Sequence, residues 1–522
     1  MKQKKKQGQA GVSQSSDTVL IKFLKLAAAP FSGILMVFAF PPYNLHFIAW
    51  IALIPLLYSL DNSSTKGSLL RGYLFGVAFL SFLFWWFTVV RYPASLGYVA
   101  FAIIIPAIFI PWAYLACLFM KKKSPFFRIW FPAALWVVLE WGMSHGTFAL
   151  PWWSLGNTQV SNLVISQLAS IGSIYLISFL VLSVNIFFFS LLSGNFKRYK
   201  SSWIILGAIL LCSIIFGVSC LREKNNESNP VKISMIQPNY SQNEKDEQIN
   251  FSEMFHNHFH ATEKVVGEYH PDIVLWSESV TFYSWLAGPT NIDFIKSKLK
   301  RLNITLISGI YDWKSEEENY NSVIAIDSET GLLGKYDKIN VVPFGEMIPY
   351  RKSIEKISGW AGKWLKEQAL AYDTTKGKEF KVFDSKSGRF STMICFESVF
   401  PHISRIFANK GAEYLFIITN DAWFLKTPGT YQHASMAALR AIETRKYTVQ
   451  ASNSGVTQII DPYGRIIDSL NVLEPGVLNG MIYPNSNKTI YMLIGDSFCL
   501  LSLIYVLVCI FLSFLISKRK TL

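Results

Sequence analysis

Residues 388–398 read Gly-Arg-Phe-Ser-Thr-Met-Ile-Cys-Phe-Glu-Ser, and this stretch predicts a β-strand that ends in a turn at Cys395. A thiol at the end of a strand is accessible to a substrate, and a backbone N–H just beyond it can bind an oxyanion. Cys395 is therefore a candidate nucleophile. The alternative interpretation is a buried cysteine that packs as a small apolar side chain.

The distribution of cysteines favours a single thiol in this region. The six cysteines are Cys117, Cys212, Cys220, Cys395, Cys499 and Cys509, and all except Cys395 lie within or at the edge of apolar stretches. A domain held by disulfides would show an even set of cysteines.

The usual base for a thiol is histidine, and His402 and His433 are both candidate partners of Cys395. His256, His258 and His260 alternate with polar and aromatic residues and predict a solvated helix face. We expect no metal there, because no carboxylate or cysteine completes a ligand set.

Two other segments place an ionisable group beside an apolar run, where its pKa can be tuned. Pro271–Trp276 is an apolar strand that leads into Ser-Glu-Ser, with Glu278 at the centre. Gly334–Lys338 leads into Val-Val-Pro-Phe-Gly-Glu, which ends at Glu346. Taken singly, each of these charges is interpreted as a solvated strand end or as a member of a salt bridge.

The surrounding residues, 231–485, alternate short β-rich runs with helical stretches, which is typical of an α/β or α+β domain. The predicted strands are Val231–Gln237, Asp272–Trp276, Ile304–Ile310, Val323–Ile326, Phe390–Ile394, Tyr414–Ile418, Thr448–Ala451 and Thr457–Ile460. The predicted helices are Glu253–Tyr269, Asp293–Leu302 and Gln432–Arg445.

The charges separate this block from the rest of the chain. Of 522 residues, 51% are hydrophobic and 16% are charged, against about 25% charged in soluble proteins. The net charge is +14, yet residues 222–488 hold 30 basic and 31 acidic residues, so the whole positive excess lies outside them. Basic residues in an apolar context mark the cytoplasmic ends of membrane spans. Nucleic-acid binding is therefore excluded as the default explanation of the charge.

Eight apolar stretches are candidate membrane helices. They are Leu20–Phe40, Leu45–Leu60, Gly72–Val90, Tyr98–Met120, Ile129–Gly142, Val164–Leu192, Trp203–Cys220 and Ser497–Ile516. The second and fifth are short, and the fifth carries Glu140, a functional candidate because a buried carboxylate is costly in a membrane. With eight spans, all five Lys/Arg clusters that flank them fall on one side, which the positive-inside rule makes cytoplasmic.

This parity places the α/β block outside the cytoplasm. We predict a polar tail at residues 1–19, a seven-helix membrane domain at 20–221, an exported domain at 222–488, and an eighth helix with a basic tail at 489–522.

Together, Glu278, Lys338 and Cys395 resemble the Glu–Lys–Cys triad of the nitrilase superfamily, whose domains are α-β-β-α sandwiches. Further motifs are similar to those of the apolipoprotein N-acyltransferase family. They are Val341–Glu346, Thr419–Phe424, Gln432-His433, Arg440-Ala441, Glu443–Arg445 and Ser452–Gly455, with Phe40–Asn44 and Leu150–Asn157 in the apolar part. Two positions depart from the pattern: Ser277 stands where Pro is frequent, and Leu425 stands where Gly is common.

The resemblance implies an enzyme of the bacterial inner membrane with its catalytic domain in the periplasm. It would transfer a fatty acyl group from a phospholipid, through a Cys395 thioester, to the α-amino group of the diacylglyceryl-modified N-terminal Cys of an apolipoprotein, the last step of lipoprotein maturation. No metal or organic cofactor is indicated. The alternative is a membrane-anchored amidase or nitrilase that uses water as the acceptor.

The resemblance also implies roles for individual residues. Glu278 is the expected general base, and Lys338 with the backbone N–H of Phe396 is expected to stabilise the oxyanion. Glu346 and Glu397 are expected to hold Lys338 and Glu278 in place, and an ordinary salt-bridge network is the alternative.

Aromatic residues are expected around this centre. Trp423 would contact the acyl chain, with Asn420 of the same motif as a further supporting residue. Trp285, Trp360 and Trp364 lie in apolar-aromatic segments among polar residues and are expected to form lids or a lipid-entry groove, since such side chains favour the membrane interface. Ordinary packing is the alternative.

Overall fold

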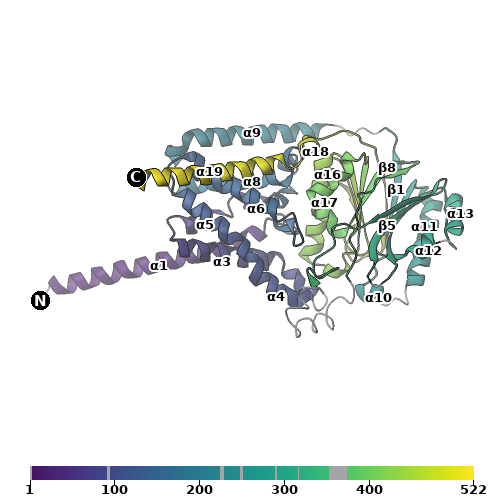
Figure 1. Cartoon of the computed structure of the whole chain (residues 1–522), viewed down its shortest axis with the longest axis horizontal. Coiled ribbons are helices and arrows are strands. Elements are labelled where there is room, and N and C mark those ends of the chain that lie inside the picture. Colours follow the sequence, from purple (N-terminus) through teal and green to yellow (C-terminus); the bar gives the residue numbers. More distant parts are fainter. Residues whose placement is uncertain are drawn as a thin grey trace.

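The computed structural model describes residues 3–90, 94–194, 196–223, 228–246, 251–288, 291–315, 317–351 and 373–521. A bundle of helices and an α/β part lie at opposite ends of an elongated molecule, and both chain termini are at the helical end (Figure 1).

Apolar helices make up the helical part. They are α1 (Gln3–Val37), α2 (Ile54–Leu60), α3 (Thr65–Leu83), α4 (Ala94–Ile104), α5 (Phe109–Met120), α6 (Phe131–Gly142), α7 (Leu163–Ser166), α8 (Ala169–Leu192), α9 (Lys200–Arg222) and α19 (Ser497–Thr521). Many large apolar side chains on α9 and α19 are exposed, as suits contact with lipid.

Five segments of the described residues are long and apolar enough to cross a bilayer. They are Val19–Val37, Gly97–Met120, Ala169–Leu192, Phe196–Arg222 and Ser497–Ile516. Eight spans are therefore not confirmed. Three predicted stretches are not among the five. The second is divided between a 3₁₀ turn and the short α2, and the third is divided between α3 and a 3₁₀ turn at Trp85–Val89. The fifth forms a helix of 12 residues that continues from a π-helical turn.

Two β-sheets form the centre of the α/β part. The strands are β1 (Val231–Gln237), β2 (Ile273–Leu275), β3 (Thr281–Phe282), β4 (Thr305–Trp313), β5 (Asn319–Asp327), β6 (Gly331–Asp337), β7 (Phe383–Ser385), β8 (Gly388–Ile394), β9 (Tyr414–Thr419), β10 (Tyr447–Ser452), β11 (Gln458–Ile460), β12 (Ile466–Ser469) and β13 (Gly476–Ile482). One sheet has the order β13-β1-β2-β4-β5-β6, with β3 beside β4, and the other has the order β12-β11-β10-β9-β8-β7.

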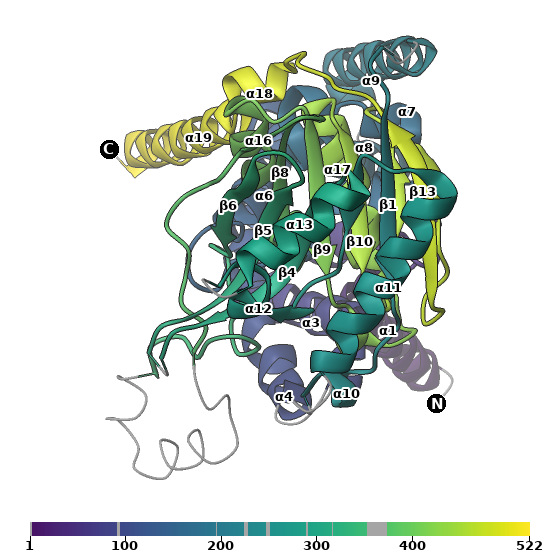
Figure 2. The ribbon, with the colours of Figure 1, turned by 90° about the vertical axis from the view of Figure 1, so that its right-hand side faces the viewer.

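Helices cover the outer faces of both sheets, which gives four layers in the order α-β-β-α, seen edge-on in Figure 1 and face-on in Figure 2. The first sheet carries α11 (Phe251–Tyr269) and α13 (Ile292–Leu302), and the second carries α16 (Pro401–Asn409) and α17 (Pro428–Thr444). Between the sheets, β1 contacts β10 and β5 contacts β8. The remaining helices of this part are α10 (Gln242–Asp246), α12 (Tyr283–Ala287) and α18 (Ile490–Ile494).

All eight predicted strands and all three predicted helices overlap elements of this fold. The sequence did not predict β3, β6, β7, β12 and β13. Several of these lie at or near sheet edges, where side chains are exposed and the alternation of apolar and polar residues is weak.

Helix α17 joins the two parts of the molecule through buried polar contacts. The side-chain oxygen of Gln432 accepts hydrogen bonds from the indole N–H groups of Trp86, at 3.3 Å, and Trp152, at 2.9 Å. The Ser173 hydroxyl, at a kink in α8, donates to Glu443 at 2.6 Å. The layer formed by α16 and α17 therefore lies between the sheets and the apolar helices (Figure 1).

Candidate active site

Cys395 lies at a sharp turn directly after β8. The strand ends at Ile394, a 3₁₀ turn covers Cys395–Val399, and Cys395 has φ of +49°, a region that non-glycine residues seldom occupy. Strain of this kind is common at functional positions because the surrounding structure maintains it. The side chain of Cys395 is partly exposed.

Glu397 fixes the backbone around this turn. The buried carboxylate accepts hydrogen bonds from the backbone N–H of Ile394 at 2.9 Å, of Ile339 at 2.8 Å and of Asn340 at 3.1 Å, and from the Tyr336 hydroxyl at 2.7 Å. It thereby connects the strand that ends before Cys395 to the segment that follows Lys338.

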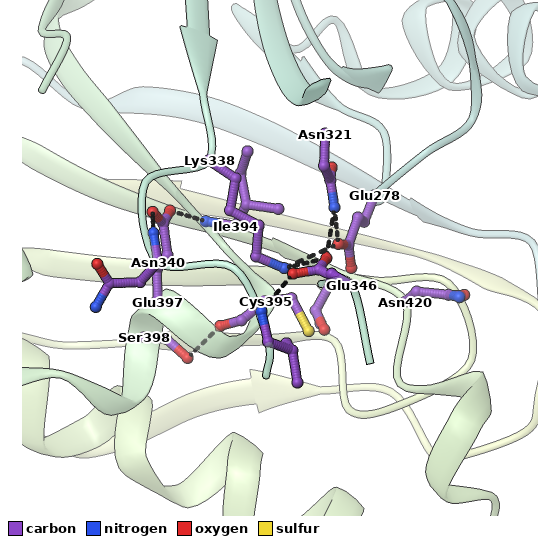
Figure 3. Close-up of polar contacts among 12 residues, drawn as sticks. Glu278, Asn321, Lys338, Asn340, Glu346, Ile394, Cys395, Glu397, Ser398 and Asn420 are labelled. Carbon is purple, nitrogen blue, oxygen red and sulfur yellow. Dashed lines mark hydrogen bonds and ion pairs between the residues drawn. The ribbon is translucent and has the colours of Figure 1, made fainter. Parts of the chain in front are cut away.

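Lys338 lies in a buried group of charges (Figure 3). Its side chain is 1% exposed, and its Nζ is 2.7 Å from Glu346 Oε1 and 3.6 Å from Glu278 Oε1. The Asn321 side-chain amide donates to Glu278 at 2.7 Å and to Glu346 at 3.1 Å. Burial alone would lower the pKa of Lys338, but the charges of Glu346 and Glu278 outweigh it and raise the pKa. Lys338 is therefore a permanent cation at neutral pH.

These charges act on the thiol of Cys395. Burial and the nearby charge of Glu278 raise the pKa of the Cys395 thiol well above its usual range, while Lys338 opposes this effect. The resting group is therefore a neutral thiol, which requires a base before it can attack. The structure brings Glu278, Lys338 and Cys395 together from three separate segments (Figure 3).

His433 also lies beside Cys395 but does not pair with its thiol. Its Nδ1 is 2.9 Å from Asp421 Oδ1, and its Nε2 is 3.1 Å from the backbone oxygen of Cys395 and 3.0 Å from Ser398 Oγ. Cys395, Asp421 and His433 are residue types that can bind a metal ion, and their ligand atoms lie within 4.8 Å of one another. Both ring nitrogens of His433 face oxygen atoms, however, so neither is available to a cation.

The other histidines lie elsewhere. His402 stacks on His145 with ring centroids 5.5 Å apart, and burial lowers its pKa to about 4. The predicted solvated face is wrong for His258, which is 1% exposed, whereas His256 and His260 are exposed. His258 is buried because its ring packs against Trp276, with centroids 5.1 Å apart.

The remaining predicted residues have varied environments. Asn420 is buried, donates to Gln242 at 2.7 Å and accepts from Asn453 at 2.8 Å. Phe396 packs edge-on against Phe400, with centroids 5.1 Å apart, and Trp423 is 36% exposed in the turn after β9.

The expected lid residues fall in two regions of the chain. Trp285, on α12, packs against Phe255 and Phe282. Trp360 and Trp364 lie outside the described residues.

Glu140 lies outside this site. It is fully buried in α6, where one carboxylate oxygen accepts from the Trp136 indole and from the backbone N–H of Leu155, both at 2.7 Å.

Sequence reasoning missed three residues of the site: Asn321, Tyr336 and Asp421. Asn321 is near the start of β5 in an ordinary polar context, so its sequence carries no signal of its position between two carboxylates. Tyr336 and Asp421 stand inside the motifs that contain Lys338 and Trp423, where a search for hydrogen-bonding neighbours could have found them.

Two family models match the chain. The apolipoprotein N-acyltransferase N-terminal domain matches residues 32–187, and the carbon-nitrogen hydrolase domain matches residues 232–486. Relatives named apolipoprotein N-acyltransferase include one from Geobacter metallireducens, 29% identical over 90% of this chain and 91% of the relative. Another, from Chlorobaculum tepidum, is 26% identical over 90% of this chain and 93% of its own length.

Among solved structures, the chain is similar to Saccharomyces cerevisiae Nit3, a member of branch 10 of the nitrilase superfamily. The identity is 16% and the TM-score is 0.38, with 49% of this chain and 91% of Nit3 covered.

Proposed function

Because the chain belongs to the apolipoprotein N-acyltransferase family, we propose that it transfers a fatty acyl group from a membrane phospholipid to the α-amino group of the lipidated N-terminal cysteine of an apolipoprotein. One observation carries the chemical part of the proposal. A neutral thiol on a strained turn lies beside a buried ammonium and the carboxylate of Glu278. A nucleophile, a base and an oxyanion donor are the groups that acyl transfer requires.

In the first step, Glu278 takes the proton of Cys395 while Sγ attacks the ester carbonyl of the phospholipid. Lys338 and the backbone N–H of Phe396 stabilise the tetrahedral oxyanion, each donor contributing about 3–4 kcal/mol. Collapse of the intermediate breaks the ester C–O bond. The leaving oxygen takes the proton from Glu278, and a lysophospholipid departs.

In the second step, the free α-amine of the acceptor attacks the thioester. Glu278 takes a proton from the amine, an amide bond forms, and the thiolate of Cys395 leaves and is reprotonated by Glu278. Glu346, Asn321 and Glu397 act as positioning residues throughout, because they hold the ammonium, the base and the turn.

An amidase with water as acceptor would use the same three residues. The N-terminal match favours acyl transfer, because residues 32–187 match the model of the apolipoprotein N-acyltransferase N-terminal domain. Removing two acyl chains from the bilayer would expose many CH₂ groups at about 0.8 kcal/mol each. A site fixed to membrane helices avoids that cost.

We also propose eight membrane spans with the catalytic domain in the periplasm of a bacterial inner membrane. The charge distribution supports this topology. The antiparallel pairing of β1 with β13 supports it as well, since it brings the exit from α9 and the return to α18 and α19 to one end of the apolar helices.

Phospholipid entry is proposed at the boundary between the two parts. Phe148, Phe344 and Tyr350 are exposed there. Phe148 stacks on Phe344 and makes a tilted contact with Tyr350, with centroids 6.2 Å apart in both pairs, and the last two residues are close in sequence to Glu346. Trp285, Trp360 and Trp364 are proposed to form lids or a lipid-entry groove, and Trp423 to contact the acyl chain.

The experiment is intact-mass analysis of the purified protein after incubation with phospholipid vesicles and no acceptor. We expect one added acyl group, removed by hydroxylamine and absent from Cys395→Ala. Cys212→Ala is the matched control, because this cysteine is exposed on α9 and should leave the adduct unchanged. A folded wild-type protein without adduct and without lysophospholipid would refute the lipid-donor step. If the acyl group is released as free fatty acid when a diacylglyceryl peptide is added, the hydrolase is favoured.

A further inference from the structure

We propose that His433 is a positioning residue, held as an imidazolium by Asp421, that anchors the backbone of Cys395 and balances the negative charge of Asp421 beside the thiol. This inference rests on the proposed role of Cys395 as nucleophile and adds a second charged pair to the site.

The hydrogen bonds of His433 require a proton on both ring nitrogens. Nδ1 faces the Asp421 carboxylate, which only accepts. Nε2 faces the carbonyl oxygen of Cys395 and the hydroxyl of Ser398. The carbonyl oxygen only accepts, so its 3.1 Å contact requires a proton on Nε2, and the hydroxyl, 2.9 Å from the same carbonyl, can donate to it and accept from Nε2. Each ring nitrogen thus has an acceptor as partner, and only the imidazolium satisfies both.

The surroundings of the ring favour the charged form. Burial would lower the pKa of His433, but the charge and hydrogen bond of Asp421 outweigh it and raise the pKa. The ring stacks on Trp152, with centroids 5.7 Å apart and an interplanar angle of 16°, an arrangement in which an aromatic face stabilises a cation. Trp152 belongs to the helical part, so this contact also crosses the boundary between the two parts of the molecule.

Asp421 needs a positive partner at this position. It is 2% exposed, Oδ1 accepts from the Thr419 hydroxyl at 2.8 Å, and Oδ2 is buried without a hydrogen bond among the described residues. The charge of Asp421 raises the pKa of the Cys395 thiol, because a thiolate would lie near a carboxylate. An imidazolium at a comparable distance offsets this repulsion, since the ligand atoms of all three groups lie within 4.8 Å of one another.

Two pairs of opposite charge therefore lie around the thiol. Glu278 and Lys338 come from the segments after β2 and β6, and Asp421 and His433 come from the turn after β9 and from α17. The first pair contains the proposed base and the oxyanion donor. The second pair has no proton to exchange with substrate, because both nitrogens of its ring are already hydrogen-bonded to protein oxygens.

The test is the pH dependence of iodoacetamide alkylation of Cys395, followed by the mass of its peptide in the full-length protein in detergent. In His433→Gln, the midpoint of alkylation should rise by about one to three pH units, because Asp421 is left uncompensated. In His433→Gln/Asp421→Asn, the midpoint should return to within about half a unit of the wild type. His402→Gln is the matched control, because this histidine contacts His145 and should leave the midpoint unchanged.

An unchanged midpoint in His433→Gln would overturn the proposal, and so would a raised midpoint that the double variant does not restore, because packing alone would then explain the effect. If His433→Gln fails to fold, Asp421→Asn tests the same balance of charge between Asp421 and His433, because it retains the imidazole ring of His433. The alkylation midpoint of Asp421→Asn should equal that of the wild type or lie below it, and a higher midpoint would overturn the proposal. These measurements need no lipid, so failure of the acyl-enzyme experiment and failure of this inference are distinguishable.

Discussion

Replacing Lys338 by Met removes the ammonium that lies between the carboxylates of Glu278 and Glu346. In the wild-type protein its Nζ is 2.7 Å from one carboxylate and 3.6 Å from the other, and its side chain is 1% exposed. Methionine fills a similar volume without charge. Two carboxylates that share the amide of Asn321 would then face each other without the cation that now separates them.

Removing one partner of a buried ion pair costs about 3–5 kcal/mol, because the remaining charge is desolvated and uncompensated. For a domain of this size, that corresponds to a fall of roughly 6–20 °C in the unfolding temperature. The two carboxylates repel each other in the folded variant only where both are ionised. The loss of stability should therefore be small at acid pH and should grow as the pH rises.

The assay is thermal unfolding of the purified variant across a pH series, beside Lys338→Met/Glu346→Gln. The double variant removes one of the two repelling charges and should recover much of the stability while remaining inactive in the acyl-enzyme assay. A Lys338→Met protein with wild-type stability at every pH would refute the electrostatic account of this site.

Three further outcomes are expected. Glu278→Gln should abolish acyl-enzyme formation yet lower the alkylation midpoint of Cys395, because burial and this carboxylate together hold the thiol pKa high; a higher midpoint would contradict the assigned charge effect. Gly309→Ala should reduce acyl-enzyme formation at least tenfold, because the new Cβ would lie 2.6 Å from the Cα of Glu278. Gly267→Ala is the control: its Cβ would have no neighbouring atom within 4 Å, so its activity should match that of the wild type. Leu425→Gly should raise the unfolding temperature by a few degrees, because Leu425 has φ of +51° and ψ of −151°, a conformation that costs a non-glycine residue about 1–3 kcal/mol; an unchanged or lower temperature would show that its side-chain contacts outweigh the strain.

The parts of the fold that the sequence predicts are those with local physical signals. The strand before Cys395 is a short run rich in β-forming residues, Phe-Ser-Thr-Met-Ile, that ends at a turn, so both its position and the place of the thiol follow from the local sequence. The same holds for the amphipathic α11 and α13, with apolar residues on one face. The number of membrane spans does not follow as directly, because the short α2 and α6 are buried by their neighbours and need not be long.

The arrangement of the site depends on contacts between distant segments, which no local pattern encodes. Asn321 reaches Glu278 from 43 positions away, and His433 reaches the carbonyl of Cys395 from 38 positions away. Leu425 illustrates the opposite case. Its departure from the family pattern is visible in the sequence, but only the backbone angle shows what the usual glycine would provide.

The pairing of β1 with β13 has a consequence for how the protein is made. These are the first and last strands of the domain, paired from Val231 with Ile482 to Gln237 with Gly476. During synthesis, the edge of β1 stays open until nearly the whole domain has emerged, and an open edge can pair with another chain. The sheet closes only about 15 residues before α19 begins. A chain truncated between Ile482 and Ser497 would keep both paired strands but lack α19, whereas a chain truncated before Gly476 would leave β1 with an unprotected edge.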